Sequence, residues 1–373
     1  MKKRIFSISL VVFLVLSLCA CFSSCGKNEK SYDVTEYRTT MQYHEDFKIL
    51  QIADLHFGIE TDIKAQLDLL EKNIDESQPD LIILTGDNFM YASKGVVKSL
   101  VGFLNDKCAK LTQARGRLTK FTLTFGNHDN QGDYPRYFIN DVMSSYTTKD
   151  GDEIKDAKYA AFVDYENDNL FGLTNFYIDL VDDRAKSLDL VDVKYRIHII
   201  DSNTYHFMGP DYDYDVIHTE QLLHAVNIYN NATKDKDYIG LAFFHIPLVE
   251  YQDAWEQFES GAGAGQGECR ENALFGYENN GAYDKLKDAN IVSFFCGHDH
   301  INHGDFIYTD KNGDKAIFSY GVKATDQLYH DTDMIGYKEI TLKNDVTKEE
   351  FVTEEYVKQC FKNVTTGYSH YED

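Results

Sequence analysis

Short apolar runs and amphipathic segments alternate along most of the chain. The runs are apolar almost throughout, which is typical of strands buried on both faces of a sheet. Between the first two runs, Ile63, Leu67, Leu70 and Ile74 recur at helical spacing. The alternation predicts an α/β fold in which helices connect parallel strands. The predicted strands are 47–53, 81–85, 121–125, 195–200, 238–244, 291–296, 316–320 and 336–342, and further helices are predicted at 94–107, 134–145 and 218–231.

Two stretches interrupt this alternation. Residues 150–192 are acidic and rich in turn residues, with hairpin strands expected at 159–163 and 175–180. Residues 260–267 read SGAGAGQG, which predicts a flexible loop. A phosphate-binding loop is the alternative, but the segment follows no predicted strand and lacks the Lys-Ser/Thr ending of a P-loop. Residues 343–373 form an acidic C-terminal extension with a helix expected over 348–361.

The first residues have the order of a signal peptide, predicted over 1–25. Basic residues 2–4 precede an apolar run that continues to about residue 22. Cys25, or else Cys21, lies where a bacterial lipobox places the cysteine that receives lipid. We therefore expect an extracytoplasmic protein, either a bacterial lipoprotein anchored to the membrane through its N-terminus or a secreted protein. Residues 26–45 would then be a tether, and 46–342 the folded domain.

Charge and cysteine content indicate which partners and structural sites are not expected. The net charge is −24, which repels nucleic-acid phosphates, so no nucleic-acid partner is expected. The chain nevertheless has 26 Tyr and 24 Phe, which is typical of a packed domain and not of an acidic disordered chain. The cysteines beyond the N-terminal segment are widely spaced without a CxxC pair, so neither a disulfide framework nor a zinc ribbon is predicted.

Asp, Asn and His side chains follow five of the predicted strands. Because the carboxyl ends of parallel strands face one crevice, these residues are expected to converge. Any one of them alone would be an ordinary turn residue. Together they offer oxygen and imidazole donors without thiolate, a set that suits Zn, Mn or Fe. The strand ends read DLH at 54–56, GDN at 86–88, GNHD at 126–129, HIP at 245–247 and GHDH at 297–300.

This ordered set of motifs resembles the calcineurin-like metallophosphoesterase superfamily. The surrounding sequence is similar to its purple-acid-phosphatase-like branch, which includes a yeast cell-cycle-regulating phosphatase. The resemblance covers roughly residues 46–342 and implies a four-layer α/β/β/α sandwich with two mixed β-sheets. True purple acid phosphatases have a tyrosine ligand at the position of Met90, so a purple chromophore is not expected here.

The resemblance also implies a centre of two divalent or trivalent metal ions, Mn, Fe or Zn. Asp87 would bridge the two ions, since a carboxylate has two oxygens. His128 would contact the substrate and protonate the leaving group, with Asp129 orienting its ring. One ion would be held by Asp54, His56 and His300, and the other by Asn127, His245 and His298.

The expected activity is hydrolysis of small phosphomonoesters by a hydroxide that bridges the metals. The same kind of site serves phosphodiesters such as cyclic nucleotides, which are the second expectation, and a non-catalytic scaffold of the same fold is the third. Substrate contacts are expected from Asn88, Tyr205 and Arg270. Tyr205 belongs to an aromatic loop that should overhang the crevice, and Arg270 could pair with a phosphate.

Overall fold

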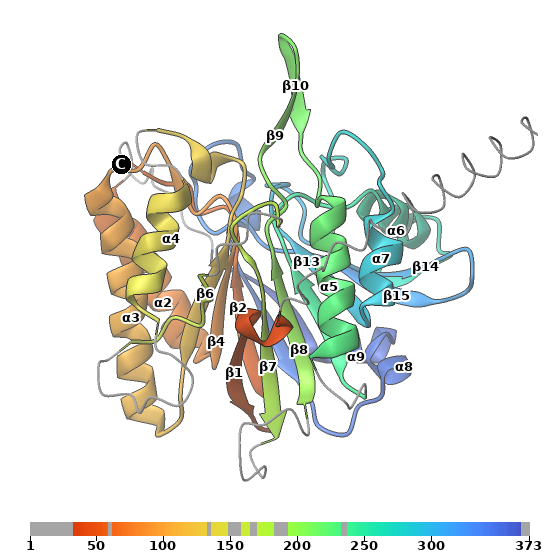
Figure 1. Ribbon diagram of the computed structural model, residues 1–373, viewed down its shortest axis with the longest axis horizontal. Helices are drawn as coiled ribbons and strands as arrows, with labels where there is room; N and C mark the ends of the chain where they lie inside the picture. The colour runs from red at the N-terminus through yellow and green to blue at the C-terminus, as the bar shows by residue number, and fades with distance from the viewer. Residues whose placement is uncertain are drawn as a thin grey trace, which may run out of the picture. The chain divides into compact units, whose positions relative to one another are not determined.

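Two mixed β-sheets form the centre of the computed structural model (Figure 1). The structure describes residues 33–58, 62–132, 136–147, 158–164, 170–182, 193–232 and 237–366. One sheet has eight strands in the order β1 (Arg38–Tyr43), β7 (Asn175–Asp182), β8 (Val193–Ile200), β11 (Ile239–Phe243), β13 (Ile291–Cys296), β15 (Lys315–Tyr320), β14 (Asp305–Thr309) and β12 (Ala264–Gln266). The other has five, in the order β17 (Phe361–Thr365), β16 (Gly336–Leu342), β2 (Phe47–Ile52), β4 (Leu81–Thr85) and β6 (Lys120–Thr124).

Helices cover the outer face of each sheet, so the predicted four-layer α/β/β/α order is confirmed (Figure 1). Apolar side chains of three helices share one buried cluster with β11, β13 and β15. The two sheets meet where the Gln51 side chain donates to Thr85 Oγ1 and to the Cys296 carbonyl. The helices beside the five-stranded sheet are α2 (Ile63–Ser77), α3 (Lys94–Arg115) and α4 (Arg136–Ser145), and those beside the eight-stranded sheet are α5 (Thr219–Asn231), α6 (Glu250–Glu259) and α7 (Ala282–Asp288).

The remaining elements are short. Two of them, β9 (Tyr205–Met208) and β10 (Asp211–Tyr214), pair as a hairpin that projects beyond the sheets (Figure 1). No described helix has the length and apolar character needed to cross a membrane. The other short elements are β3 (Phe57–Gly58), β5 (Phe89–Met90), α8 (Lys348–Phe351), α9 (Glu354–Cys360) and the 3₁₀ turns η1 (Val34–Tyr37), η2 (His128–Asn130) and η3 (Thr332–Met334).

The folded unit is wider than the predicted 46–342. Strand β1 lies in the segment predicted as a tether and pairs in parallel with β7. Strand β17 lies in the predicted C-terminal extension and pairs with β16, and the helix expected over 348–361 is divided into α8 and α9. Both strands are at sheet edges and mix polar with apolar residues, so a search for apolar runs misses them. The predicted signal peptide, Cys21 and Cys25 lie outside the described residues.

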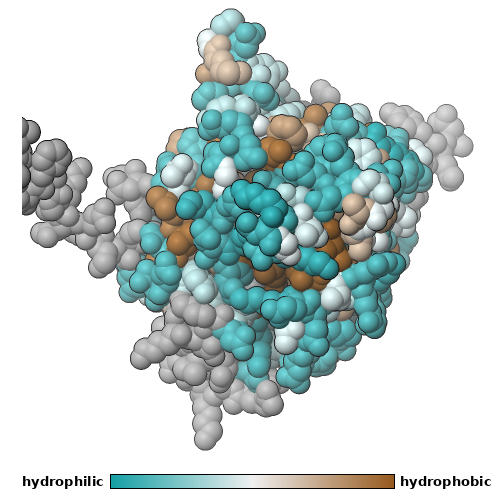
Figure 2. Space-filling view, turned by 90° about the vertical axis from the view of Figure 1, so that its right-hand side faces the viewer, coloured by the Kyte–Doolittle hydropathy of each residue, from teal (hydrophilic) through white to brown (hydrophobic). Residues whose placement is uncertain are grey.

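Two local predictions also differ from the structure. Residues 159–163 form no strand; Ala160 makes single bridges to Phe121 and Thr147. Part of the predicted flexible loop 260–267 is strand β12, which pairs with β14 at the edge of the larger sheet. Figure 2 shows the side of the unit that bears α6 and α7: hydrophilic side chains cover most of it, in keeping with the net charge of −24.

Candidate metal centre

The side chains predicted as metal ligands meet where β2, β4, β6, β11 and β13 end. All seven are buried, with His298 the most exposed at 5%, although they come from five separate places in the sequence. Donor atoms of six of these ligands, together with His128, form groups in which every atom lies within 4.8 Å of the others. The groups are Asp54, His56 and His300; His56, Asp87 and His128; and Asp87, His245 and His298.

The first group surrounds His300. Its Nε2 lies 3.1 Å from His56 Nε2 and 3.6 Å from Asp54 Oδ1. Its Nδ1 lies 2.8 Å from the carbonyl oxygen of Tyr329. A carbonyl only accepts, so Nδ1 carries a proton and Nε2 is the ring nitrogen that faces His56 and Asp54. This is the tautomer that a metal ligand requires.

The group of Asp87, His245 and His298 surrounds His245 in the same manner. Its Nδ1 donates to the Thr85 carbonyl at 2.9 Å, so Nε2 is the ring nitrogen directed to the centre. That Nε2 lies 3.2 Å from Asn127 Oδ1, 3.3 Å from Asp87 Oδ2 and 3.2 Å from His298 Nδ1. The Asn127 amide is oriented by Tyr205, whose hydroxyl accepts from Asn127 Nδ2 at 2.7 Å, and this places Oδ1 toward the centre.

Asp87 lies between the two groups. Its Oδ2 is 3.3 Å from His245 Nε2 and 3.9 Å from both His56 Nε2 and His128 Nε2. Its Oδ1 accepts from the backbone N–H of His128 at 2.7 Å. Burial favours the neutral carboxyl, but the three histidines outweigh it and hold the pKa of Asp87 well below its usual range. The carboxylate is thus ionised and lies within 4 Å of three histidine rings.

This donor set fits metal ions. His56 and His300 present ring nitrogens to each other at 3.1 Å, and the lone pair on His300 needs a cation or a proton as its partner. Burial lowers the pKa of His245, yet Asp87 and Asp54 raise it to about 9, so these carboxylates favour a positive charge, a proton or a metal ion, at His245 Nε2. Four buried imidazoles, two carboxylates and an amide oxygen, without thiolate, suit Mn, Fe or Zn.

The turns that carry the ligands have unusual backbone conformations. Asp54, His56, Asp87 and His298 have φ of 56°, 48°, 46° and 76°, in the left-handed region that non-glycine residues seldom adopt. Such strain persists where the surrounding structure enforces it, and it gathers at functional sites. The sequence motifs therefore mark strained turns as well as ligand types.

One segment holds the Asp54-Leu55-His56 turn. Lys323 Nζ donates to the Asp54 carbonyl at 3.1 Å, Thr325 Oγ1 donates to the Leu55 carbonyl at 2.9 Å, and Ala324 N donates to the Ala53 carbonyl at 2.8 Å. Sequence reasoning missed Lys323 and Thr325. The available signal was a charged lysine close after the predicted strand 316–320.

Glycines at the strand ends give the centre its room. A Cβ on Gly126 would lie 2.3 Å from Asp87 N and Oδ1 and 2.7 Å from His245 Cδ2, which are impossible contacts. We expect Gly126→Ala to lower the free energy of unfolding by about 1–3 kcal/mol, because the backbone must move to relieve the overlap. It should also reduce the bound metal below two ions per chain.

The matched control is Gly95→Ala in α3, where the added Cβ lies 3.7 Å from Ser93 Oγ in ordinary contact. Urea unfolding and metal analysis of both variants measure the two effects. Equal stability and equal metal content in the two variants would show that the close approach at Gly126 is unimportant.

Asp129 and Asn88 have different roles from those predicted. Asp129 accepts from Gly126 N and Phe89 N at 2.8 Å and from Asn88 Nδ2 at 3.0 Å, so it joins two ligand turns and does not contact the His128 ring. His128 Nδ1 is buried without a hydrogen-bond partner among the described residues. Asn88 is buried and also donates to the Thr124 carbonyl, so its amide nitrogen holds a turn, and its contact with substrate stays a prediction.

Arg270 pairs with carboxylates of the protein itself. Its guanidinium forms ion pairs with Glu268, Asp331 and Asp333 at 2.8–2.9 Å. Three carboxylates surround this one cation, which leaves the local charge negative and makes a phosphate contact unfavourable. The predicted role of Arg270 in phosphate binding is therefore not supported by its surroundings.

Two aromatic residues flank the centre without having been predicted there. The Tyr214 ring meets His298 edge to face with centroids 4.3 Å apart, and the Tyr329 ring stacks on His300 at 4.2 Å. Tyr214 belongs to the aromatic loop already expected to overhang the site. Nothing in the sequence marks Tyr329, whose position depends on the path of a loop beyond β15.

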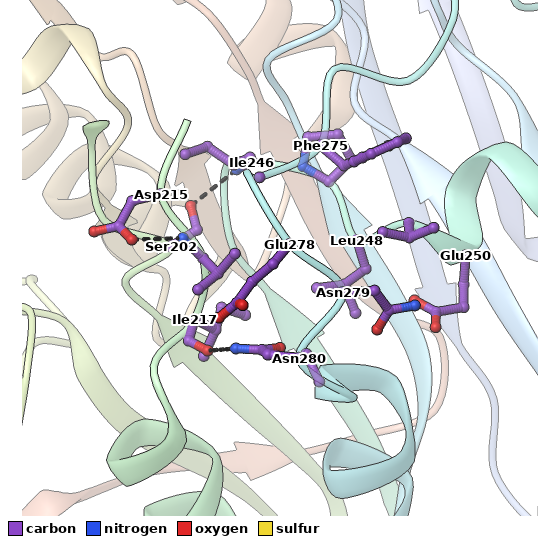
Figure 3. Close-up of a pocket in the computed structure, with 15 residues that line it drawn as sticks. Ser202, Asp215, Ile217, Ile246, Leu248, Glu250, Phe275, Glu278, Asn279 and Asn280 are labelled. Atoms are coloured by element: carbon purple, nitrogen blue, oxygen red, sulfur yellow. Dashed lines mark hydrogen bonds between the residues drawn. The ribbon is translucent and has the colours of Figure 1, made fainter. Parts of the chain in front are cut away.

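Ser202 forms hydrogen bonds with the backbone of the turn that carries His245. Its Oγ accepts from the backbone N–H groups of His245 and Ile246 at 3.2 and 2.9 Å, which fixes the turn after β11. Figure 3 shows Ser202 at the edge of a small pocket between this turn and the segment that carries Phe275 and Asn280. The pocket volume is about 20 Å³, room for about one water molecule, so it is no substrate site.

Comparison with known proteins gives a consistent result. The model of the calcineurin-like phosphoesterase family matches residues 47–302, more than half of the chain. The chain is 24% identical over 298 residues to Phosphatase DCR2 of Saccharomyces cerevisiae, covering 74% of this chain and 47% of DCR2, so it spans about half the length of that relative. It is 26% identical over 323 residues to Probable inactive purple acid phosphatase 29 of Arabidopsis thaliana, covering 78% of this chain and 75% of the relative. A structural match to a crystal structure of a dimetal phosphatase from Danio rerio has a TM-score of 0.46 at 10% identity and covers 81% of this chain and 94% of that chain.

Proposed function

We propose that this chain, which belongs to the calcineurin-like phosphoesterase family, hydrolyses phosphomonoesters at its two-metal site. Family membership makes it a metal-dependent phosphoric ester hydrolase; the ester class and the roles of single residues are the proposal. The observation that carries it is the position of Asp87, which lies between two groups of buried nitrogen and oxygen donors with His128 beside it.

Seven residues of the chain would bind the two metal ions. Asp54, His56 and His300 would hold one metal ion and Asn127, His245 and His298 the other, with Asp87 shared between them. When bound, the two ions would supply positive charge to the phosphoryl oxygens and activate the attacking water. The hydrogen bonds from His245 and His300 to backbone carbonyls keep both rings oriented for binding.

In this proposal His128 contacts the substrate. Its side chain is 25% exposed, whereas the side chains of His56 and His245 are fully buried. Its Nε2 lies 3.9 Å from Asp87 Oδ2, and Asp87 Oδ1 holds its backbone N–H. From this position it can hydrogen-bond a phosphoryl oxygen and give a proton to the departing alcohol oxygen.

Monoesters are favoured over diesters by what covers the centre. Tyr205 contacts Asn127, the Tyr214 ring contacts His298, and the Tyr329 ring stacks on His300, so aromatic side chains border the centre at three of its ligands. A phosphate with one alcohol group needs access from one direction, whereas a diester needs room for two. The strong negative charge of the chain also disfavours long polyanionic substrates.

A non-catalytic role is the second candidate, because the printed name of the plant relative describes it as probably inactive. Against this, all seven predicted ligands of the present chain lie in one buried cluster, with the partly exposed His128 beside it. The experiment is to assay the protein loaded with Mn, Fe or Zn on 4-nitrophenyl phosphate and bis(4-nitrophenyl) phosphate, which share a leaving group. We expect faster hydrolysis of the monoester; faster hydrolysis of the diester would reverse the ester class, and no hydrolysis of either ester would support a scaffold.

A further inference from the structure

The β9–β10 hairpin has two chemically different faces. The pairing sets Tyr205 opposite Tyr214 and Phe207 opposite Tyr212. Side chains alternate between the faces of a strand, so these four rings lie on one face, which we call the aromatic face. The intervening pairs, His206 with Asp213 and Met208 with Asp211, lie on the other face.

The inner pair of the aromatic face contacts the metal centre. The Tyr205 hydroxyl accepts from Asn127 Nδ2 at 2.7 Å, and the Tyr214 ring meets the His298 ring at 4.3 Å. Both partners belong to the same predicted metal site. The aromatic face is therefore continuous with the place where the phosphate would bind.

The base of the hairpin is anchored on its opposite side. The His206 ring stacks on Tyr277 with centroids 3.9 Å apart, and Tyr277 N donates to the Tyr214 carbonyl at 2.8 Å. These contacts hold the orientation of the hairpin. The aromatic face is consequently presented to the centre in a fixed direction.

The outer pair is exposed. Phe207 is 71% and Tyr212 64% accessible, and their rings lie 6.1 Å apart. They are two residues farther along each strand than the inner pair, so they lie roughly 7 Å farther from the metal centre. Figure 2 shows the hairpin projecting from the surface with hydrophobic as well as hydrophilic side chains. Exposed aromatic rings at a fixed distance from a reactive centre are suited to stacking on a ligand.

We propose that the aromatic face binds a planar aromatic ring in the alcohol part of the substrate, such as the base of a nucleoside monophosphate. This inference rests on the proposed function. The phosphate would bind at the metal centre, and the ring would stack on Phe207 and Tyr212. The acidic residues Asp211 and Asp213 lie on the opposite face, so the aromatic face itself bears no charged side chain.

The test compares adenosine 5′-monophosphate with ribose 5-phosphate. Both esters release a primary alcohol oxygen of ribose, so their reactivities are matched and the base is the difference. We expect the metal-loaded protein to have a kcat/KM roughly tenfold to a hundredfold higher for the nucleotide, the range expected for stacking of one base.

The double variant Phe207→Ala/Tyr212→Ala should lower the ratio of the two kcat/KM values at least fivefold. The control is Met208→Ala/Asp211→Ala, which alters a pair at the same hairpin end on the opposite face and should keep the ratio. All four residues are exposed, so folding should persist, and equal thermal midpoints check this.

A ratio near one in the unaltered protein, or a ratio that the aromatic double variant leaves unchanged, overturns the inference. If that variant instead only abolishes self-association in sedimentation, the aromatic face contacts a second copy, which also overturns it. These results leave the proposed function standing when ribose 5-phosphate is hydrolysed. If neither ester nor 4-nitrophenyl phosphate is hydrolysed, the proposed function fails and this inference fails with it.

Discussion

Asp87→Asn is expected to reduce kcat/KM for phosphomonoesters by roughly a thousandfold or more. The substitution keeps the shape of the side chain and the Oδ1 that accepts from His128 N. It removes the negative charge and replaces the oxygen that faces His56 and His245 with an amide nitrogen. An amide cannot bridge two cations as a carboxylate does, so the affinity for the metal ions should fall and the distance between them should change.

Steady-state kinetics and metal analysis of the same samples measure this effect. The matched control is Asp211→Asn, which removes an exposed carboxylate on the hairpin face opposite the aromatic face. This variant should retain activity and two ions. If Asp87→Asn retained two ions and full activity, Asp87 would not be a bridging ligand. A loss of activity in both variants would instead indicate a general effect of surface charge.

His128→Ala is expected to lower kcat by about a hundredfold to ten thousandfold on alkyl phosphates, because the leaving alkoxide loses its proton donor. Metal content should stay at two ions per chain, since His128 is the partly exposed histidine beside the buried donor set. The loss should be smaller on 4-nitrophenyl phosphate, whose leaving group departs without protonation.

The comparison of leaving groups separates catalysis from structure. A variant that merely distorted the site would lose activity equally on both esters and would bind less metal. His44→Ala, at a partly exposed histidine after β1, serves as a control for the loss of an imidazole. Undiminished turnover of the alkyl ester would remove His128 from the mechanism.

Much of the site could be predicted from sequence because its ligands follow buried strands. Residues 47–53 and 81–85 are apolar runs, and the parallel pairing of β2 with β4 brings Asp54 and Asp87 together. This follows from the general geometry of parallel sheets. The ligand turns also need glycine for steric reasons, so the motifs include Gly86, Gly126 and Gly297.

Long-range partners could not be predicted in this way. Arg270 pairs with Asp331 and Asp333, about sixty residues away, and no local pattern reveals that pairing. Asp129 follows His128 directly, yet its carboxylate is turned to Gly126, Phe89 and Asn88 by the 3₁₀ turn η2. Adjacency in sequence was a poor guide to the direction of that side chain.

The edge strands show a second limit. Strand β1 reads RTTMQY and strand β17 reads FKNVT, and neither is an apolar run. At the edge of a sheet, one side of the strand lacks a neighbour and polar residues are tolerated. Such strands are recognised by their pairing with β7 and β16, which only the fold provides.

The most direct test of the central claim is a metal titration of the stripped protein with 4-nitrophenyl phosphate as substrate. Mn²⁺ or Zn²⁺ is added in known equivalents while hydrolysis and bound metal are measured together. The two-metal centre around Asp87 predicts that activity rises with bound metal and reaches its plateau at two ions per chain. Full activity in the stripped protein, a plateau at a single ion, or two bound ions without hydrolysis would contradict it.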